Sequence, residues 1–396
     1  MVQRKPTQYS DALLEVIRRE HPDLLTPALE AAYREVPRHS FLPDAGMQEA
    51  YEDKAIPIKR DSDGSVLSSC SQPSMIALML RQLDLREGDN VLEIGAGTGY
   101  NAALMQHVVG ERGNVTTIEL DKEIAQQAAM NLQRVRLGAV VSVVNADGAL
   151  GYAPRASYDR IIATVAMWDI PPGWERQLKP DGVLVAPVWL ESMQVSAAFR
   201  LDDDGRLYSD TNLPCGFVPL RGIAAGPNVM RRVSSSTLNL AAYGVKHLDS
   251  AAVHLLLSDQ PEETLLSPSL TLTEFWQGFL PYLTLNIPEG CVFALYTVSE
   301  GTQAYGLSGS GFALIARGSA CFVPYDASGQ TLSFASADAF MALNDTLLAW
   351  DQAGRPDVSR LRLRLMPKTL NSALTPQPNY AVYSRLYHDV HVWLDL

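Results

Sequence analysis

Val91-Leu92-Glu93-Ile94-Gly95-Ala96-Gly97-Thr98-Gly99-Tyr100 is the stretch of the chain that decides its fold. The first four residues form a short apolar run of the kind that fills the middle of a parallel sheet. The three glycines that follow permit a tight turn and close approach of a ligand to the main chain. The stretch therefore predicts a strand, a turn and a helix, with either a nucleoside-type ligand over the turn or a turn that serves packing alone.

Strand and helix patterns alternate on both sides of this turn. Before it, residues 10–35 carry apolar residues at helical spacing, interrupted by Pro22, and a further helix begins near Ser74. After it come the expected strands, at residues 114–119, 140–144, 158–164 and 182–188, with a helix at 122–137. This alternation predicts a Rossmann-like, doubly wound α/β sheet whose ligand lies over the carboxyl ends of the strands.

Composition limits the classes of function. The chain has 396 residues, of which 47% are hydrophobic, and a formal net charge of −12. This length suits two domains, and the acidic balance without clustered Lys and Arg argues against nucleic-acid or anionic-membrane partners. The four cysteines are far apart without C-x-x-C spacing, and no N-terminal apolar run or membrane-length stretch is present. We therefore expect a cytoplasmic protein without a metal site.

Three acidic residues narrow the choice of ligand. Glu119 ends the strand after the glycine turn, where a carboxylate can accept hydrogen bonds from two ribose hydroxyls, and Asp147 follows the next strand. Glu93 lies in the glycine stretch itself, where an acid is poorly placed beside phosphates but well placed near a cation. This charge pattern favours S-adenosylmethionine, which lacks phosphate and carries sulfonium and amino groups, over a dinucleotide.

Several separate motifs carry a resemblance to a known family. They occur over about residues 10–222, in the following order: Val36–Pro43, Ala50–Ile58, Ser71-Gln72-Pro73, Val91–Tyr100, Thr117-Ile118-Glu119, Asp147-Gly148, Gln177-Leu178-Lys179 and Gly216–Leu220. Together they resemble the protein-L-isoaspartate O-methyltransferases. The resemblance implies a class I methyltransferase fold, the cofactor S-adenosyl-L-methionine and methyl esterification of a peptidyl carboxylate.

The resemblance also implies roles for individual residues. It places the methionine end of the cofactor on the glycine stretch, the ribose on Glu119 and the adenine beside Asp147, so that the expected cofactor-binding residues are Glu93, Gly95, Gly97, Thr98, Gly99, Tyr100, Glu119, Leu120, Asp147 and Gly148. Ser71 matches the family's active-site serine, which holds the substrate carboxylate near the methyl group. The expected substrate-binding residues around it are Ser69, Cys70, Gln72, Pro73 and His39.

Simpler roles compete with these at three positions. Ser71 is also a candidate N-cap for the helix that follows it, and one hydroxyl cannot fill both roles fully. Cys70 suits packing better than nucleophilic attack, because the reaction needs no covalent intermediate, and His39 suits a structural hydrogen bond. A carboxylate is ionised at neutral pH, so its attack on a sulfonium methyl requires no strong general base.

The chain departs from the family pattern before Ser71. Several extra residues, including Asp61, Asp63 and Gly64, lengthen the segment between Ile58 and Ser71. The sequences Ser68–Ser74 and Gly97–Ala103 more closely resemble a branch found beside genes for ribosomally made peptides such as lanthipeptides and graspetides, whose members commonly carry a C-terminal extension as this chain does. Members of that branch methylate an aspartate of a modified peptide, and the ester then cyclises to an aspartimide.

We expect three regions: a helical lid and substrate loop at 1–80, the methyltransferase core at 81–228 and an α+β domain at 229–396. In the last region a helix is expected at 273–280, ending before Pro281, and another at 337–350. Strands are expected at 291–298, 312–316, 320–325, 360–365 and 387–393. His388 and His391 would lie on opposite strand faces, which disfavours a shared metal. This domain either recognises the peptide, mediates homodimerisation or only stabilises the core.

The functional alternatives remain open from sequence. The leading interpretation is an enzyme that methylates an aspartyl or isoaspartyl carboxylate in the maturation of one dedicated peptide. The second is general repair of isoaspartyl residues in damaged proteins. A third is a module that keeps the cofactor fold and binds a peptide without turnover.

Overall fold

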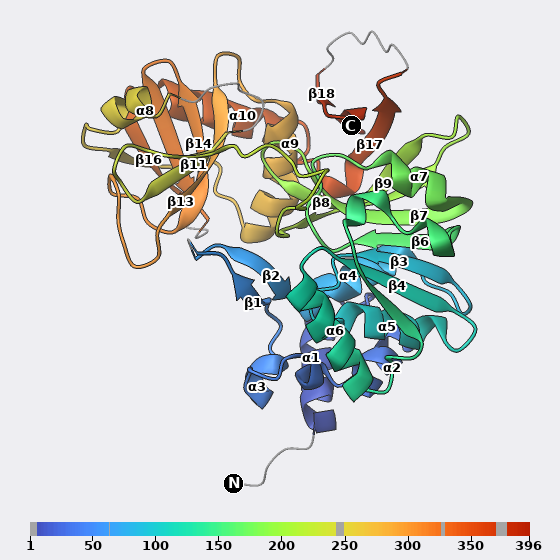
Figure 1. The fold of residues 1–396 in the computed structure, drawn as a ribbon. Coiled ribbons are helices and arrows are strands. Elements are labelled where there is room, and N and C mark those ends of the chain that lie inside the picture. Colours follow the sequence, from blue (N-terminus) through green and yellow to red (C-terminus); the bar gives the residue numbers. More distant parts are fainter. Residues whose placement is uncertain (1–5, 63, 243–248, 326–328, 370–377) are drawn as a thin grey trace. The chain divides into compact units, whose positions relative to one another are not determined.

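The computed structural model describes residues 6–62, 64–242, 249–325, 329–369 and 378–396. Asp63, one of the extra residues before Ser71, lies outside them. The chain divides into two compact units, each described here by itself (Figure 1). The first unit comprises the residues up to Val188, Ser196–Thr211 and Cys215–Gly226, and the second comprises Trp189–Val195, Asn212–Pro214 and Pro227–Leu396.

A twisted sheet forms the centre of the first unit. Its strand order is β9-β8-β7-β6-β3-β4-β5, in which β7, β6, β3, β4 and β5 run parallel. The strands are β3 (Asn90–Ile94), β4 (Asn114–Glu119), β5 (Val141–Asn145), β6 (Tyr158–Ala163), β7 (Leu178–Trp189), β8 (Gln194–Leu201) and β9 (Leu207–Cys215). From β3 the chain first adds β4 and β5 on one side and then β6 and β7 on the other, so the strand order reverses beside β3. Doubly wound sheets bind their ligands at such a switch point. The expected Rossmann-like sheet is confirmed.

Helices cover this sheet and supply most of the unit's apolar core. The expected interruption at Pro22 separates α1 from α2, and Thr26 caps α2 through a hydrogen bond from the Leu29 amide. Helix α1 packs against α2, and α2 packs against α5, with Tyr33 and Tyr100 in edge-to-face contact. The helices are α1 (Pro6–Glu20), α2 (Pro27–Glu35), η1 (Arg38–Phe41), α3 (Met47–Ala50), α4 (Pro73–Leu83), α5 (Tyr100–Val109), α6 (Lys122–Arg134), η2 (Gly148–Leu150), η3 (Ala153–Arg155) and α7 (Pro172–Gln177).

A two-stranded hairpin precedes α4. Strands β1 (Ile56–Arg60) and β2 (Val66–Cys70) are antiparallel, and Ile56 pairs with Cys70 at the base of the hairpin. The sequence alone does not predict this hairpin, because neither strand shows clear alternation of apolar and polar residues. The segment before Ser71 therefore forms an antiparallel hairpin with register shifts between Pro57 and Arg60, and Asp61 and Gly64 lie between its two strands.

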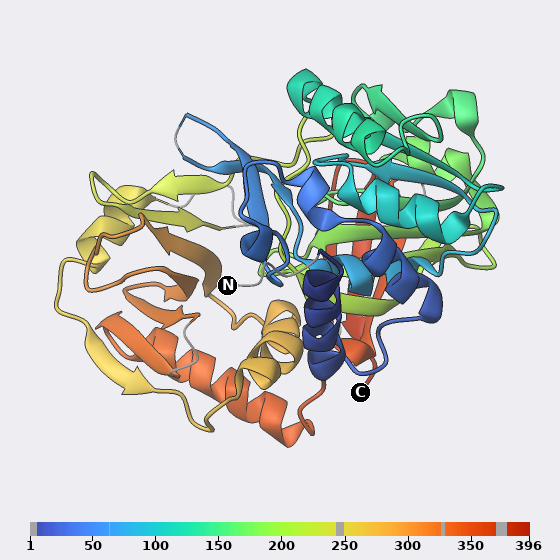
Figure 2. The same ribbon diagram turned by 90° about the horizontal axis from the view of Figure 1, so that it is seen from below.

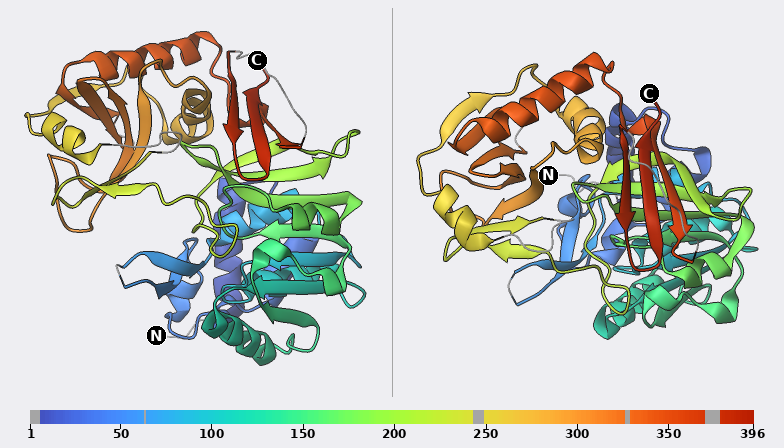
Figure 3. Two further views of the ribbon diagram at one scale, coloured as in Figure 1. Left: turned by 45° about the horizontal axis from the view of Figure 1, so that its top comes forward. Right: turned by 90° about the horizontal axis from the view of Figure 1, so that it is seen from above.

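The second unit contains two groups of antiparallel strands. The larger sheet has the order β10-β11-β13-β14-β15-β16-β12, and α10 runs along one of its faces (Figure 2). The smaller group pairs β18, β19 and β17 side by side (Figure 3). The elements are β10 (Met230–Arg232), β11 (Leu238–Ala241), α8 (Ser250–Leu256), β12 (Glu262–Leu265), η4 (Glu274–Phe279), α9 (Leu280–Leu285), β13 (Val292–Val298), β14 (Ser310–Ala316), β15 (Ser319–Pro324), β16 (Gln330–Ala335), α10 (Asp338–Gln352), η5 (Val358–Arg360), β17 (Leu361–Pro367), β18 (Tyr380–Ser384) and β19 (His388–Leu394).

One helix of this unit differs from the expectation. The helix was expected to stop before Pro281, but η4 is a π-helix that leads directly into α9, and Pro281 lies in the first turn of α9. A proline in a first turn costs no hydrogen bond, because the amides there have no partner within the helix. No helix among the described residues is long and apolar enough to cross a membrane.

Candidate active site

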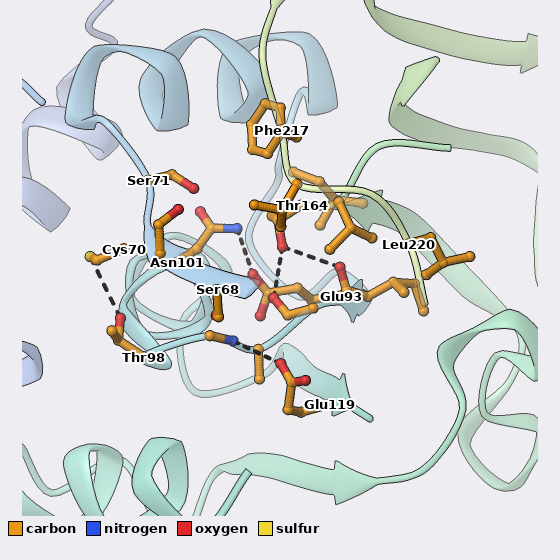
Figure 4. Close-up of a pocket in the computed structure, with 18 of the residues that line it drawn as sticks. Ser68, Cys70, Ser71, Glu93, Thr98, Asn101, Glu119, Thr164, Phe217 and Leu220 are labelled. Carbon is orange, nitrogen blue, oxygen red and sulfur yellow. Dashed lines mark hydrogen bonds between the residues drawn. The ribbon is translucent and has the colours of Figure 1, made fainter. Parts of the chain in front are cut away.

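A cavity of about 210 Å³ lies within the first unit, at the carboxyl ends of β3, β4 and β6. It is bounded by the glycine turn, by β2 with the residues after it, and by the segment 216–221 (Figure 4). Twelve of the predicted site residues line it: Ser69, Cys70, Ser71, Gln72, Glu93, Gly95, Gly97, Thr98, Tyr100, Glu119, Leu120 and Gly148. The four that do not line it are His39, Pro73, Gly99 and Asp147.

The glycine turn follows a path that glycine favours strongly. Gly95, Gly97 and Gly99 all have positive φ, at 97°, 51° and 84°. A β-carbon on Gly95 would lie 2.8 Å from the Thr164 hydroxyl, which donates hydrogen bonds to the carbonyls of Ile94 and Gly95. Gly99 is the N-cap of α5 and faces α6, which explains why it does not line the cavity.

Glu93 is the fully buried acid of the site. Its Oε1 accepts a 2.7 Å hydrogen bond from Asn101 Nδ2, whereas Oε2 meets no donor in hydrogen-bonding geometry among the described residues. The pKa of Glu93 is raised to about 7, chiefly by burial and to a smaller extent by the nearby Glu119 charge, while hydrogen bonds with Thr117 and Asn101 act in the opposite direction. Asn101 Oδ1 is also buried without a donor, so two acceptor atoms in this corner suit a ligand with several N–H donors.

Glu119, at the end of β4, lies at the other end of the cavity from Ser71 (Figure 4). Its Oε2 accepts a hydrogen bond from the Gly97 amide at 3.2 Å, and its Oε1 accepts one from the Asp121 amide at 3.1 Å. Arg221 Nη2 is 4.0 Å from Oε1. The glycine turn and the end of β4 are thus joined through one carboxylate.

Asp147 has partners outside the cavity. Its Oδ1 accepts a hydrogen bond from the Ala149 amide, as the N-cap of η2, and its Oδ2 accepts one from the Ile223 amide at 2.8 Å. A β-carbon on Gly222 would lie 2.2 Å from that Oδ2. Asp147 therefore anchors the segment after residue 221, while its neighbour Gly148 lines the cavity.

The Ser71 side chain lines the cavity and is not the cap of α4. The Asp53 carboxylate takes that place, because Oδ1 accepts a hydrogen bond from the Ser74 amide at 2.8 Å and Oδ2 accepts one from Gln72 Nε2 at 2.9 Å. The capping alternative for Ser71 is wrong, since a side chain 18 residues earlier caps the helix. Sequence spacing could not indicate so distant a partner.

The other expected substrate residues have structural contacts. Cys70 is 3% exposed and its sulfur accepts a hydrogen bond from the Thr98 hydroxyl. The Pro73 carbonyl accepts one from the Tyr33 hydroxyl. His39 Nδ1 lies 2.9 Å from the Tyr51 hydroxyl, and burial lowers the pKa of His39. These contacts match the structural alternatives considered for Cys70 and His39.

Sequence reasoning assigned no role to several lining residues. Asn101 donates a hydrogen bond to Glu93, and Thr164 donates one to the Gly95 carbonyl of the glycine turn. Phe217 and Leu220 belong to the segment 216–221. Backbone hydrogen bonds join this segment to Ala166, beyond the end of β6. The motif Gly216–Leu220 was a signal for this segment, but its place at the cavity depends on the fold. No group of three or more His, Cys, Asp or Glu among the described residues is suited to a metal.

Comparison with known proteins identifies the family. The sequence profile described as Protein-L-isoaspartate(D-aspartate) O-methyltransferase (PCMT) matches residues 9–224, which is more than half of the chain. The chain belongs to the protein-L-isoaspartate O-methyltransferase family. Membership makes it a protein carboxyl O-methyltransferase that acts on peptide or protein substrates and uses S-adenosyl-L-methionine as cofactor.

Relatives within the family cover the first unit. The protein-L-isoaspartate O-methyltransferase of Methanopyrus kandleri is 40% identical over 191 residues, 48% of this chain and 82% of the relative. Protein-L-isoaspartate O-methyltransferase 2 of Archaeoglobus fulgidus is 40% identical over 212 residues, 54% of this chain and 92% of the relative. A solved structure titled protein-L-isoaspartate O-methyltransferase aligns with a TM-score of 0.52 at 24% identity, over 90% of this chain and 96% of that chain. This fold similarity therefore includes part of the C-terminal region.

Proposed function

We propose that the chain forms a methyl ester on an isoaspartyl carboxylate of a peptide or protein, and that Ser71 orients that carboxylate. The supporting observation is that the Ser71 side chain lines the cavity while Asp53 caps α4. Because a carboxylate is already ionised at neutral pH, it needs a donor that holds it in place rather than a base that activates it. A serine hydroxyl supplies one such donor.

We assign the cofactor to the cavity through the polar atoms that line it. Glu93 and Asn101 suit the cationic amino group, because both have buried acceptor atoms without donors. Glu119 suits the ribose hydroxyls, and Gly148, with Asp147 behind it, suits the adenine side. Bound there, S-adenosyl-L-methionine supplies the electrophilic methyl group that the carboxylate attacks.

Apolar side chains near Ser71 contribute by excluding water. Met75, Ile76, Met79 and Phe217 line the cavity together with Ser71. A carboxylate that loses its hydration shell there is more reactive towards a methyl cation equivalent, and correct orientation of two bound reactants supplies roughly 7 to 11 kcal/mol of barrier reduction. The residues therefore need only to bind, orient and dehydrate.

The substrate proposal is tested by methyl transfer to two synthetic peptides that differ at one residue, isoaspartate in one and aspartate in the other. We expect base-labile methyl ester only, or mainly, on the isoaspartyl peptide. Equal labelling of both peptides would exclude isoaspartyl specificity. Cofactor binding without labelling of either peptide would favour the alternative of a non-catalytic peptide-binding module.

Maturation of a dedicated peptide through an aspartimide is the second candidate. The observation that favours it is that the β1–β2 hairpin leads directly into Ser71, because the extra residues expected in this hairpin from the sequence would alter the substrate surface. The C-terminal extension carries less weight, because a solved protein-L-isoaspartate O-methyltransferase aligns with 90% of the chain. Incubation with a precursor peptide encoded beside the gene would decide: ester formation at one aspartate, then loss of methanol, would support maturation.

The second unit has no assigned chemistry. We propose that it either binds part of the peptide substrate or mediates homodimerisation, with structural support of the first unit as the alternative. Light scattering at several protein concentrations tests the dimer, since a monomer mass throughout would exclude it. Localisation in the cytoplasm remains an expectation from sequence, tested by fractionation of the source cells.

A further inference from the structure

We propose that Arg38 is a positioning residue for Ser71, acting through the main chain on either side of the β1–β2 hairpin. The inference rests on the proposed function, because it concerns the serine that orients the substrate carboxylate. Arg38 does not line the cavity. Any effect on methyl transfer must therefore pass through the residues that it holds.

The Arg38 guanidinium is 0% exposed and its hydrogen bonds go to main-chain carbonyls. Nε donates to the Ala50 carbonyl at 2.8 Å, and Nη2 donates to the Ser71 carbonyl at 2.9 Å and more weakly to the Lys54 carbonyl at 3.5 Å. These acceptors lie 12, 33 and 16 residues away along the chain. One side chain thus joins three segments that have no local reason to meet.

The position of these acceptors shows what the guanidinium fixes. Lys54 lies just before β1, and Ser71 lies just after β2. Ile56 and Cys70, the adjoining residues of the two strands, pair with each other. Arg38 therefore holds both chain ends at the base of the hairpin. The Ser71 carbonyl is one of the atoms held at this base. The hydrogen bonds from Arg38 to the carbonyls of Ala50, Lys54 and Ser71, called the clamp below, therefore fix where the Ser71 side chain lies in the cavity.

Burial of the charged Arg38 guanidinium costs desolvation free energy. No acidic side chain forms an ion pair with Arg38 among the described residues, and Nη1 has no hydrogen-bond partner there. The guanidinium carbon instead lies 5.0 Å from the centre of the Tyr100 ring, which does line the cavity. An apolar residue of similar volume would avoid the desolvation cost. A planar guanidinium, in contrast, can donate hydrogen bonds to several carbonyls at once while it stacks on an aromatic ring.

Asp53 complements the clamp from the other side of Ser71. Its carboxylate holds Gln72 and the first turn of α4, so the residues after Ser71 are fixed as well as the Ser71 carbonyl. The hydroxyl is left for the substrate. Arg38 and Asp53 together thus restrict where the Ser71 side chain lies without using its donor.

The experiment compares R38K, S71A and the double variant in the full chain, with kcat and KM for an isoaspartyl peptide and the Kd of S-adenosylhomocysteine by calorimetry. A lysine ammonium keeps the charge but cannot span the carbonyls in a fixed fork. We expect R38K to lower kcat about 10- to 100-fold, the scale of a misplacement of about 1 Å, with the Kd changed less than about twofold. In the S71A background, R38K should lower kcat less than about twofold, because the Ser71 hydroxyl that Arg38 positions is already absent.

The matched control is R160K. Arg160 is 5% exposed and also donates to main-chain carbonyls, those of Asp84 and Asp159, but it differs in having an ion pair with Asp89 at 3.4 Å and does not line the cavity. R160K should lower thermal stability without lowering kcat of the folded enzyme. An equal loss of kcat in R38K and R160K, or a full loss from R38K in the S71A background, would reduce Arg38 to a structural residue.

A rescue experiment covers the case in which R38K folds poorly. R38A leaves space for a guanidinium ion, and millimolar guanidinium should restore part of kcat, whereas methylammonium should not. Absence of any rescue with folded R38A, or wild-type kcat in R38K, would overturn the inference. Inactivity of the wild-type enzyme towards every peptide would instead count against the proposed function, and the two failures are therefore distinguishable.

Discussion

Asn101 Nδ2 donates a 2.7 Å hydrogen bond to Oε1 of the fully buried Glu93 carboxylate, whereas Oε2 has no donor in hydrogen-bonding geometry among the described residues. The pKa of Glu93 is raised to about 7, chiefly by burial. A carboxyl whose pKa is raised in the folded state stabilises the fold when protonated and destabilises it when ionised. The ionised Glu93 carboxylate in the predicted cofactor site therefore lowers the stability of the folded protein.

Glu93→Gln should stabilise the ligand-free protein at alkaline pH. The protonated carboxyl is favoured below the unfolded pKa of about 4.5, and that advantage is lost as pH rises through the folded pKa of about 7. At pH 8 the ionised group costs on the order of 3 kcal/mol. Thermal unfolding of both proteins at pH 5 and pH 8 measures this, and we expect the variant to gain stability relative to wild type only at pH 8. An equal difference at both pH values would contradict the raised pKa.

Cofactor binding should strengthen as pH rises through about 7, because the ionised form of Glu93 attracts the cationic amino group. Calorimetric titration of S-adenosylhomocysteine between pH 5.5 and pH 8.5 tests the expectation. Glu93→Gln is the control, and its affinity should be lower and nearly independent of pH in this range. A pH dependence that survives in the variant would assign the titration to another group.

Asn101→Leu should move the same titration to higher pH. The substitution removes the Asn101 donor to Glu93 Oε1 and leaves an apolar side chain of similar size, so the ionised carboxylate loses a charge-assisted hydrogen bond. The midpoint of the pH dependence should rise by about one pH unit, which corresponds to about 1.4 kcal/mol. An unchanged midpoint would show that Asn101 does not stabilise the charge.

Gly95→Ala tests the glycine turn against a matched glycine. Gly95 and Gly88 have nearly the same positive φ, at 97° and 88°, so alanine brings similar backbone strain at both positions. A β-carbon at Gly95 would lie 2.8 Å from Thr164 Oγ1, whereas nothing lies within 4 Å at Gly88. Gly95→Ala should cost about 1 to 3 kcal/mol more in unfolding free energy and should weaken cofactor binding. Equal costs would mean that the turn relaxes.

Particular residues show how far the sequence predicts the structure. Thr26, Pro22 and the glycine turn act within a few residues of themselves, and the helices and strands that they predict are present. The hydrogen bonds of Arg38 and Asp53 join residues 12 to 33 positions apart, and no local sequence pattern reveals such pairs. Long-range hydrogen bonds depend on the finished fold.

The same distinction separates the two regions. In the first unit, the resemblance to a family supplied residue assignments, and twelve of sixteen fall on the lining of one cavity. The hairpin before Ser71 was missed because its strands lack alternation. In the second unit, most expected strands are present, and η4 lies where a helix was expected. Its continuation into α9 was missed, because a proline acts as a helix breaker or as a first-turn residue according to where the helix begins.

The measurement that tests the central claim most directly is methyl transfer to an isoaspartyl peptide by wild type and Ser71→Ala, with the Kd of S-adenosylhomocysteine measured for both. We predict that the wild type forms a base-labile ester, and that the variant binds the cofactor product equally well while its kcat falls about 10²-fold, the effect of losing one orienting donor. Wild-type kcat in Ser71→Ala, or failure of the wild type to form any ester, would contradict the account.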